Sequence, residues 1–120
     1  MTAWHHSLLA TLDAGIWTAS EPVRRPAGVV LVSSMARLEA DDIDDATVTV
    51  FLDGTVDHPG LADGWRELGS VELSPGTSIG WLGTDGMLPV PPVSHLRLRA
   101  SHSGGAPSSA SITLHLSADR

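Results

Sequence analysis

The sequence predicts an all-β domain, an antiparallel β-sandwich of jelly-roll type with about six to eight strands. Three observations predict it. Short segments rich in β-branched residues recur along the chain, and several of them alternate apolar and polar side chains with the two-residue period of a strand. Clusters of Gly, Pro, Asp and Ser separate these segments, as turns do. A chain of 120 residues is expected to form one domain.

Residues 1–20 are expected to form an N-terminal arm or a short helix that packs on the domain or on a neighbour, and residues 21–120 to form the sandwich. Leu8 and Leu12 are four residues apart, as on one face of a helical turn, with Leu9 beside them. An extended arm fits this segment equally well. Large apolar groups near a chain end suggest docking, since undocked ends are usually disordered.

In the first half of the sandwich, the connector at 21–26 contains two prolines, which disfavour both helix and ladder pairing. Residues 27–38 are predicted to be a strand because β-branched residues dominate them. The acidic run at 41–45 is predicted to be a turn. Residues 47–52 alternate as a strand, and the Asp-Gly dipeptide at 53–54 is predicted to close it with a turn.

In the second half, residues 65–73 are predicted to be a strand with a bulge at Gly69. A short strand is expected at 79–82, followed by a Gly/Pro-rich loop at 83–92. The last two strands are expected at 93–100 and 111–117, and both alternate well. Alternation assigns an inward face to Val48, Val50, Leu52, Leu96, Leu98, Ile112, Leu114 and Leu116, and an outward face to His95, Arg97, Arg99, Thr113 and His115.

Charge and composition exclude several classes of protein. The formal net charge of −7 disfavours binding to nucleic acid, which needs a basic surface. No apolar stretch reaches the roughly 18 residues of a membrane-spanning helix. The start of the chain lacks the basic and apolar regions of a signal peptide, so synthesis in a cytoplasm is expected. The absence of cysteine excludes disulfides and cysteine-based metal sites.

The sequence predicts neither an enzyme nor a site for a metal or cofactor. Residues 76–80 read Gly-Thr-Ser-Ile-Gly, but a Gly-x-Ser-x-Gly nucleophile elbow lies between a strand and a helix, and no helix is predicted after this serine. No phosphate-binding glycine loop is present. His95 and His115 would be neighbours if the last two strands pair, but a zinc site needs further converging ligands. The acidic cluster of Asp41, Asp42, Asp44 and Asp45 is either a solvated turn, which is the favoured interpretation, or a weak cation site.

Four of the five aromatic residues are tryptophans. Tryptophan is enriched at protein interfaces, whereas ordinary core packing is the favoured role of Trp65. Trp4, near the chain end, is expected to contact another subunit. Trp81, in the Gly/Pro-rich region, could instead stack on a sugar. The candidate partner-binding residues are Trp4, Leu8, Leu9, Trp17 and Trp81.

A pattern in residues 47–73 and 93–116 extends this interpretation. The first segment reads as an alternating strand, an Asp/Gly loop, and then Trp-Arg-Glu-Leu-Gly-Ser-Val. The second reads His-Leu-Arg-Leu-Arg-Ala, a Ser/Gly/Pro turn, and Ser-Ile-Thr-Leu-His-Leu. The arrangement resembles small β-sandwich structural proteins, decoration or accessory, of tailed bacteriophages over about residues 27–117. The loop between Asp53 and Trp65 is longer than in that pattern, and Val-Ser-His stands where an Arg-Tyr pair is common.

The resemblance implies a non-enzymatic virion protein, most simply a capsid decoration (cement) protein on the outside of the phage head. Its expected partners are the major capsid protein and copies of itself. Deleting residues 1–20 is expected to abolish attachment and to leave the sandwich folded. Two alternatives remain: a carbohydrate-binding β-sandwich module that recognises a surface glycan, and an accessory tail or connector subunit.

Overall fold

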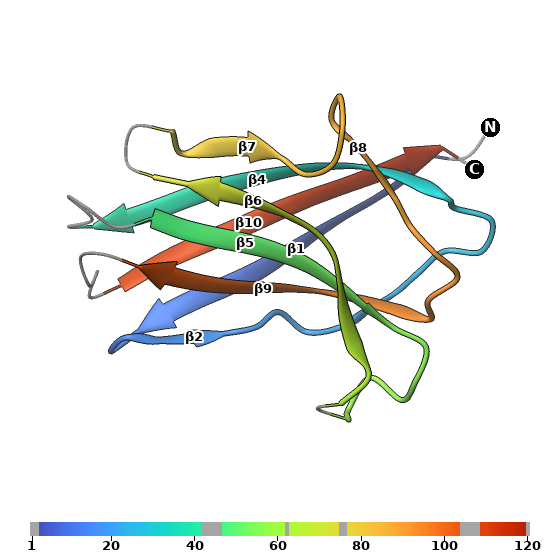
Figure 1. The fold of residues 1–120 in the computed structure, drawn as a ribbon, viewed down its shortest axis with the longest axis horizontal. Coiled ribbons are helices and arrows are strands. Elements are labelled where there is room, and N and C mark those ends of the chain that lie inside the picture. The colour runs from blue at the N-terminus through green and yellow to red at the C-terminus, as the bar shows by residue number, and fades with distance from the viewer. Residues whose placement is uncertain (1–2, 42–46, 62, 75–76, 104–108, 120) are drawn as a thin grey trace.

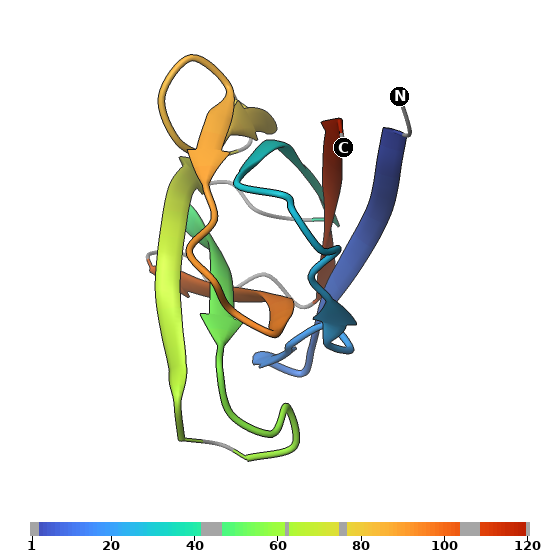
Figure 2. The same ribbon diagram turned by 90° about the vertical axis from the view of Figure 1, so that its right-hand side faces the viewer.

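The computed structural model describes residues 3–41, 47–61, 63–74, 77–103 and 109–119. These residues form ten strands and no helix, arranged as two sheets that face each other (Figures 1 and 2). The strands are β1 (Ala3–Asp13), β2 (Ile16–Thr18), β3 (Val23–Arg24), β4 (Leu31–Asp41), β5 (Thr47–Thr55), β6 (Trp65–Leu73), β7 (Ile79–Trp81), β8 (Met87–Pro89), β9 (His95–Ser103) and β10 (Ser109–Asp119).

Sheet A has the strand order β2-β1-β10-β4-β7, with β8 also paired to β4, and sheet B has the order β3-β9-β5-β6. All pairings are antiparallel. If β7 and β8 are counted as one interrupted strand and β2 is set aside, eight strands remain. The first of them, β1, lies beside the eighth, β10, and the second, β3, lies beside the seventh, β9. This nesting is the jelly-roll arrangement. The predicted fold class is therefore confirmed, with more strands than expected.

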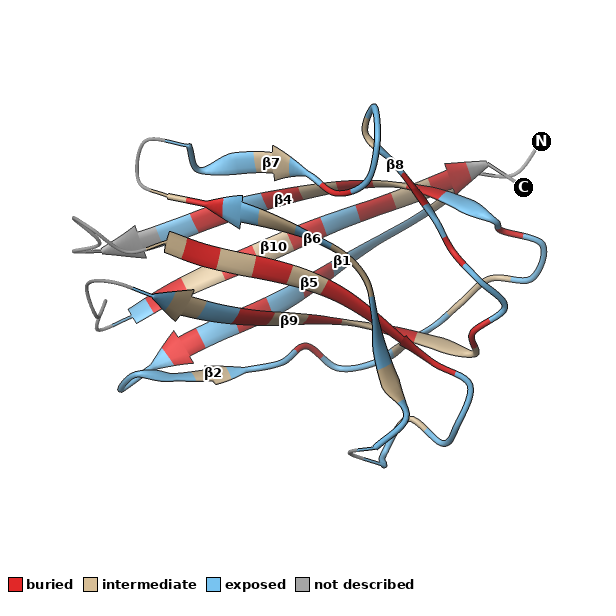
Figure 3. Ribbon diagram, viewed as in Figure 1, coloured by how far each residue is buried: buried red, intermediate tan, exposed pale blue. Residues whose placement is uncertain are grey.

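The core lies between the sheets and is built by alternation, which is clearest along β5 in Figure 3. Leu52, Leu98 and Leu114 are fully buried, and every residue assigned to the inward face from the sequence is buried. Burying one such leucine side chain contributes about 2 kcal/mol relative to leaving it exposed. The predicted faces of β5, β9 and β10 are confirmed.

The first twenty residues are not a separate arm, and the helical alternative is wrong. β1 pairs with β10 along its whole length, from Ala3 opposite Asp119 to Asp13 opposite Ser109. Leu8 and Leu12 belong to the core because residues four apart also share a face in a strand. Deleting residues 1–20 would remove an integral strand of sheet A, so the sandwich is not expected to survive that truncation.

The Asp53–Gly54 dipeptide lies inside β5 instead of ending it. The register between β5 and β6 shifts at this point, where Leu52 faces Gly69 and Asp53 faces Glu67, leaving Leu68 as the extra residue. A bulge is therefore present, but its extra residue is Leu68, the residue before the predicted Gly69. A β-carbon on Gly69 would lie 2.7 Å from Cδ1 of Leu88, so the Leu88 side chain packs against the space that a larger residue would need.

Two sharp hairpins shape sheet A. The Ala14–Gly15 turn has φ of 53° and 81°, and the Asp85–Gly86 turn has φ of 54° and 78°. Positive φ at both central residues defines a type I′ turn, whose twist matches that of the flanking strands. The segment 83–92, which was predicted to be a loop, therefore contains the second hairpin and the strand β8.

Candidate functional site

The outer face of sheet A carries a cluster of exposed apolar side chains around Trp81. Four of the nine large apolar side chains that are exposed among the described residues belong to it. Trp81 (51% exposed) lies opposite the half-buried Met35 in the β4–β7 pairing. We call this surface the Trp81 patch; its members are Leu31, Met35, Ile79, Trp81 and Met87. Scattered apolar residues are ordinary on surfaces, but a contiguous patch marks an interaction site.

Beside the indole of Trp81 is an open depression of about 320 Å³, lined by Ser33, Trp81, Asp85, Gly86 and Met87. A β-carbon built on Gly86 would lie 3.6 Å from the Trp81 ring, which shows that the ring lies against the type I′ turn. The depression therefore combines an exposed aromatic surface with residues that carry a carboxylate and a hydroxyl group. Apolar walls with a few polar groups are typical of small-molecule sites.

The N-terminal candidates divide into buried and exposed residues. Leu8 is 3% exposed and packs in the core, so its predicted contact with a partner is wrong. Leu9 is 54% exposed on the outer face of sheet A. Trp4 is half-buried against the core, and its ring stacks on His6 at a centroid distance of 6.2 Å. Of these three residues, only Leu9 and part of Trp4 are therefore accessible in the folded chain.

Trp17 is half-buried, packs against the core, and donates its indole N–H to Nδ1 of His102 over 2.9 Å. This contact ties β2 of sheet A to β9 of sheet B.

The five predicted partner-binding residues do not form one surface. Trp81 lies at the β7 edge of sheet A, whereas Leu9 lies on β1, two strands beyond the β4 strand that pairs with β7.

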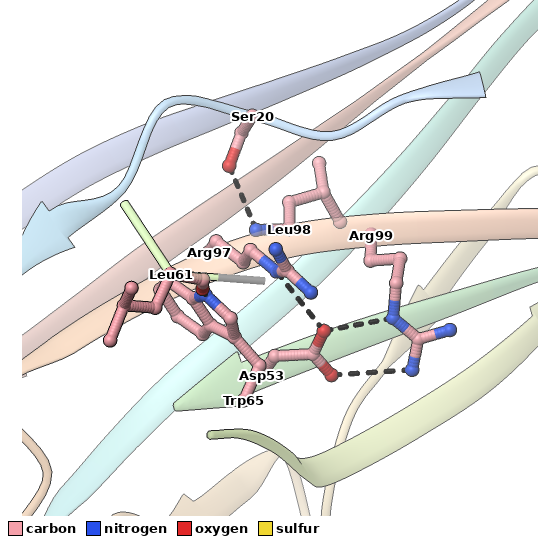
Figure 4. Close-up of polar contacts among 7 residues, drawn as sticks. All are labelled: Ser20, Asp53, Leu61, Trp65, Arg97, Leu98 and Arg99. Atoms are coloured by element: carbon pink, nitrogen blue, oxygen red, sulfur yellow. Dashed lines mark hydrogen bonds and ion pairs between the residues drawn. The ribbon is translucent and has the colours of Figure 1, made fainter. Parts of the chain in front are cut away.

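The outer face of sheet B differs from that of sheet A. The group of charged and aromatic side chains at its centre was not predicted from the sequence. Asp53 is 2% exposed, yet its carboxylate lies on this face beneath two arginines (Figure 4). Nε of Arg99 donates to Oδ2 over 2.8 Å and Nη2 to Oδ1 over 3.3 Å, while Nε of Arg97 donates to Oδ2 over 3.3 Å. The guanidinium of Arg97 lies 4.4 Å from the ring centroid of Trp65. The guanidinium of Arg99 lies 4.0 Å from the ring centroid of Phe51.

We call these five residues the Asp53 cluster. The buried carboxylate is paired and hydrogen-bonded, as a buried charge must be, and the rings cover both cations. The cluster joins β5, β6 and β9 across the outer face of sheet B. Core packing predicted for Trp65 is wrong: its ring lies on the outer face, and its indole N–H donates to the carbonyl of Leu61 over 3.1 Å.

The histidines do not converge. β9 and β10 lie in different sheets, so the pairing that would make His95 and His115 neighbours is absent. His95 contacts the hydroxyl of Ser94 and His115 that of Ser7, each at 3.0 Å. Within the described segments, no group of three or more His, Cys, Asp or Glu side chains could hold a metal ion. The acidic cluster at 41–45 lies outside the described residues, apart from the backbone of Asp41.

Comparisons with protein-family models, with curated proteins and with solved structures gave no match. In the part of the chain that the structure describes, no helix is long and apolar enough to cross a membrane. The two outer faces differ in character. That of sheet A carries the exposed apolar residues around Trp81, and that of sheet B carries the paired charges around Asp53.

Proposed function

We propose that the protein is a non-enzymatic structural protein of a tailed-phage particle, which decorates the outside of the head and contacts the major capsid protein through the Trp81 patch. The patch is the observation that carries the proposal. Its exposed members have no charge, although the chain has a formal net charge of −7. Interface centres are depleted in charge and enriched in Trp and Met. The phage context comes from the sequence resemblance.

A decoration protein works by binding the assembled shell and not its separated subunits. Such binding stabilises the bound state by mass action. A rigid sandwich suits this role, because little conformational entropy is lost when a preformed surface docks. Self-association of the decorating chains would add avidity, since a shell repeats the same site many times.

The test is co-sedimentation of the purified protein with phage heads prepared without it. Wild type is compared with Trp81→Ser and with Val56→Ser, a matched control whose side chain is 70% exposed outside the patch. Wild type and Val56→Ser are expected to decorate the heads, and Trp81→Ser to lose at least tenfold in affinity. Decoration by Trp81→Ser at wild-type affinity would show that the patch is not the contact. No decoration by wild type would remove the proposed function.

Carbohydrate binding is the second candidate, and the depression beside Trp81 favours it. Ser33 and Asp85 line the same depression as the exposed indole, so hydrogen-bonding groups accompany a surface on which a sugar ring could stack. The test is a titration of tryptophan fluorescence with host cell-wall sugars, using wild type and Asp85→Asn. Asn is well suited to the type I′ turn, so the variant changes the charge and keeps the hairpin.

Saturable quenching that weakens in Asp85→Asn supports sugar recognition. Fluorescence that no sugar changes counts against it. Attachment to heads depends on the apolar members of the patch and is expected to survive Asp85→Asn. The two candidates therefore predict opposite behaviour for one variant.

A further inference from the structure

β1 presents a long unpaired edge. One side of the strand pairs with β10 throughout, but the other side pairs with β2 only between Thr11 and Asp13. In Figure 2, β1 is the outermost strand on its side of the molecule. No strand among the described residues pairs with the segment from Trp4 to Ala10 on that side.

The hairpin at Ala14–Gly15 determines which backbone groups lie on the open edge. It is a two-residue type I′ hairpin, so the N–H and C=O of Asp13 point towards its partner Ile16 in β2. The backbone groups of successive residues point to opposite sides of a strand, so every second residue repeats this direction. The N–H and C=O groups that point away from β10 on the open edge are therefore those of His5, Ser7 and Leu9.

The other described edges are protected. β2, β3, β7 and β8 are only two or three residues long. β6 has nine residues, but it is bulged and carries the exposed charges of Arg66, Glu67 and Glu72. Short edges, bulges and charges are the usual defences against pairing with another chain. Between Trp4 and Ala10, β1 has no proline and no Asp, Glu, Lys or Arg.

We propose that this open edge pairs antiparallel with β1 of a second copy, which joins the two A sheets into one continuous sheet. The inference rests on the self-association included in the proposed function, and it names the surface responsible. Antiparallel pairing of a segment with itself around a two-fold axis is self-complementary. If all three residues with open backbone groups take part, Ser7 lies near the axis and His5 opposite Leu9 of the other copy.

Charge favours a second copy as the occupant. Two chains of net charge −7 repel each other, so they can meet closely only where neither presents a negative side chain. The open edge of β1 meets this condition. Pairing would also cover part of the exposed Leu9 and the half-buried Trp4. One pair of strands buries less than the roughly 1,200 Å² of a standard interface, so an affinity in the micromolar range is expected.

Ser7→Pro tests the pairing directly. The N–H of Ser7 points away from β10, so proline removes one donor from the open edge and leaves the β1–β10 ladder intact; proline is tolerated at such edge positions. Ser7→Ala is the matched control, because it keeps the N–H. Thr113→Lys, on the outer face of sheet A in β10, is the control for association through the face of the sheet.

Sedimentation velocity between about 1 and 100 μM is expected to show a concentration-dependent dimer for wild type, Ser7→Ala and Thr113→Lys, and a monomer for Ser7→Pro. A monomeric wild type, a Ser7→Pro dimer of unchanged affinity, or loss of the dimer in Thr113→Lys would each overturn the pairing. Circular dichroism checks that Ser7→Pro is folded.

Amide exchange of the wild type provides a second measurement that does not depend on any variant. The amides of His5, Ser7 and Leu9 are expected to gain protection as the protein concentration rises, while those exposed elsewhere do not. Equal exchange at low and high concentration would overturn the pairing. A monomer that decorates heads would overturn the pairing alone, and a dimer that binds no head would overturn the proposed attachment alone.

Discussion

The carboxylate of Asp53 accepts a 2.8 Å hydrogen bond from Nε of Arg99, although the two residues are 46 positions apart in the chain. Asp53 is 2% exposed, whereas Arg99 is 39% exposed, so the acid is buried beneath a base that still reaches solvent. The pair therefore joins β5 to β9 on the outer face of sheet B.

Asp53→Ala is expected to lower the free energy of unfolding by about 2 kcal/mol, less than the 3–5 kcal/mol typical of a fully buried pair. The loss is smaller because Arg97 and Arg99 can hydrate once the carboxylate is gone. Urea unfolding at neutral pH measures the change. A loss below about 0.5 kcal/mol would mean that the desolvation of Asp53 cancels the attraction.

Arg99→Lys is expected to cost about 1 kcal/mol, since lysine cannot make the two-pronged contact with Asp53 or lie flat over Phe51. Arg37→Lys is the matched control, because Arg37 forms an exposed ion pair. Its Nε lies 3.7 Å from Oε1 of Glu39, and the two side chains are 57% and 69% exposed. Such surface pairs contribute little, so a change within about 0.5 kcal/mol is expected. Equal losses in the two variants would contradict a special role for the Asp53 cluster.

Ala14→Asn is expected to raise the free energy of unfolding by about 0.5–1 kcal/mol, because alanine is strained at φ of 53° and asparagine tolerates this region. Asp85→Asn makes the corresponding change in the other type I′ turn. Aspartate is already suited to that position, so almost no change is expected. Thermal unfolding of both variants measures the difference, and a destabilised Ala14→Asn would show that the strain lies elsewhere.

Ser34 and Ser20 are both buried serines, but their hydroxyl groups differ. Oγ of Ser34 has no hydrogen-bond partner among the described residues, whereas Oγ of Ser20 accepts the backbone N–H of Leu98 over 2.8 Å (Figure 4). Ser34→Ala is therefore expected to be neutral or to stabilise by up to about 1 kcal/mol, and Ser20→Ala to destabilise by about 1–3 kcal/mol. Urea unfolding should show a loss of stability for Ser20→Ala and none for Ser34→Ala; equal losses would contradict the assignment.

The sequence predicts a strand and its buried face correctly where the residues of that strand alternate between apolar and polar side chains. In β5, β9 and β10 the alternation is regular, and the buried faces follow directly. In β1 it is disguised, because His6 is exposed on the inward side and Leu9 is apolar on the outward side. The spacing of Leu8 and Leu12 then matches a helix as well as a strand. Strands of two or three residues are too short to show any period.

The candidate sites were harder to predict, because they depend on pairings between distant segments. The alternation of β9 places Arg97 and Arg99 on one face, but nothing local shows that Asp53 lies between them. An Asp-Gly dipeptide after an apolar strand is ordinarily a turn. The Trp81 patch likewise depends on β7 lying beside β4, which a three-residue strand does not reveal.

The pairing of β1 with β10 has a consequence for folding kinetics. These strands come from opposite ends of the chain, and Ala3 faces Asp119. During synthesis β1 cannot pair with β10 until the segment up to Asp119 has left the ribosome. Contacts this distant in sequence slow folding. The ends of β1 and β10 lie together (Figure 1), so a circular permutant that joins them with a short linker and opens the chain at another turn should fold faster than the native order.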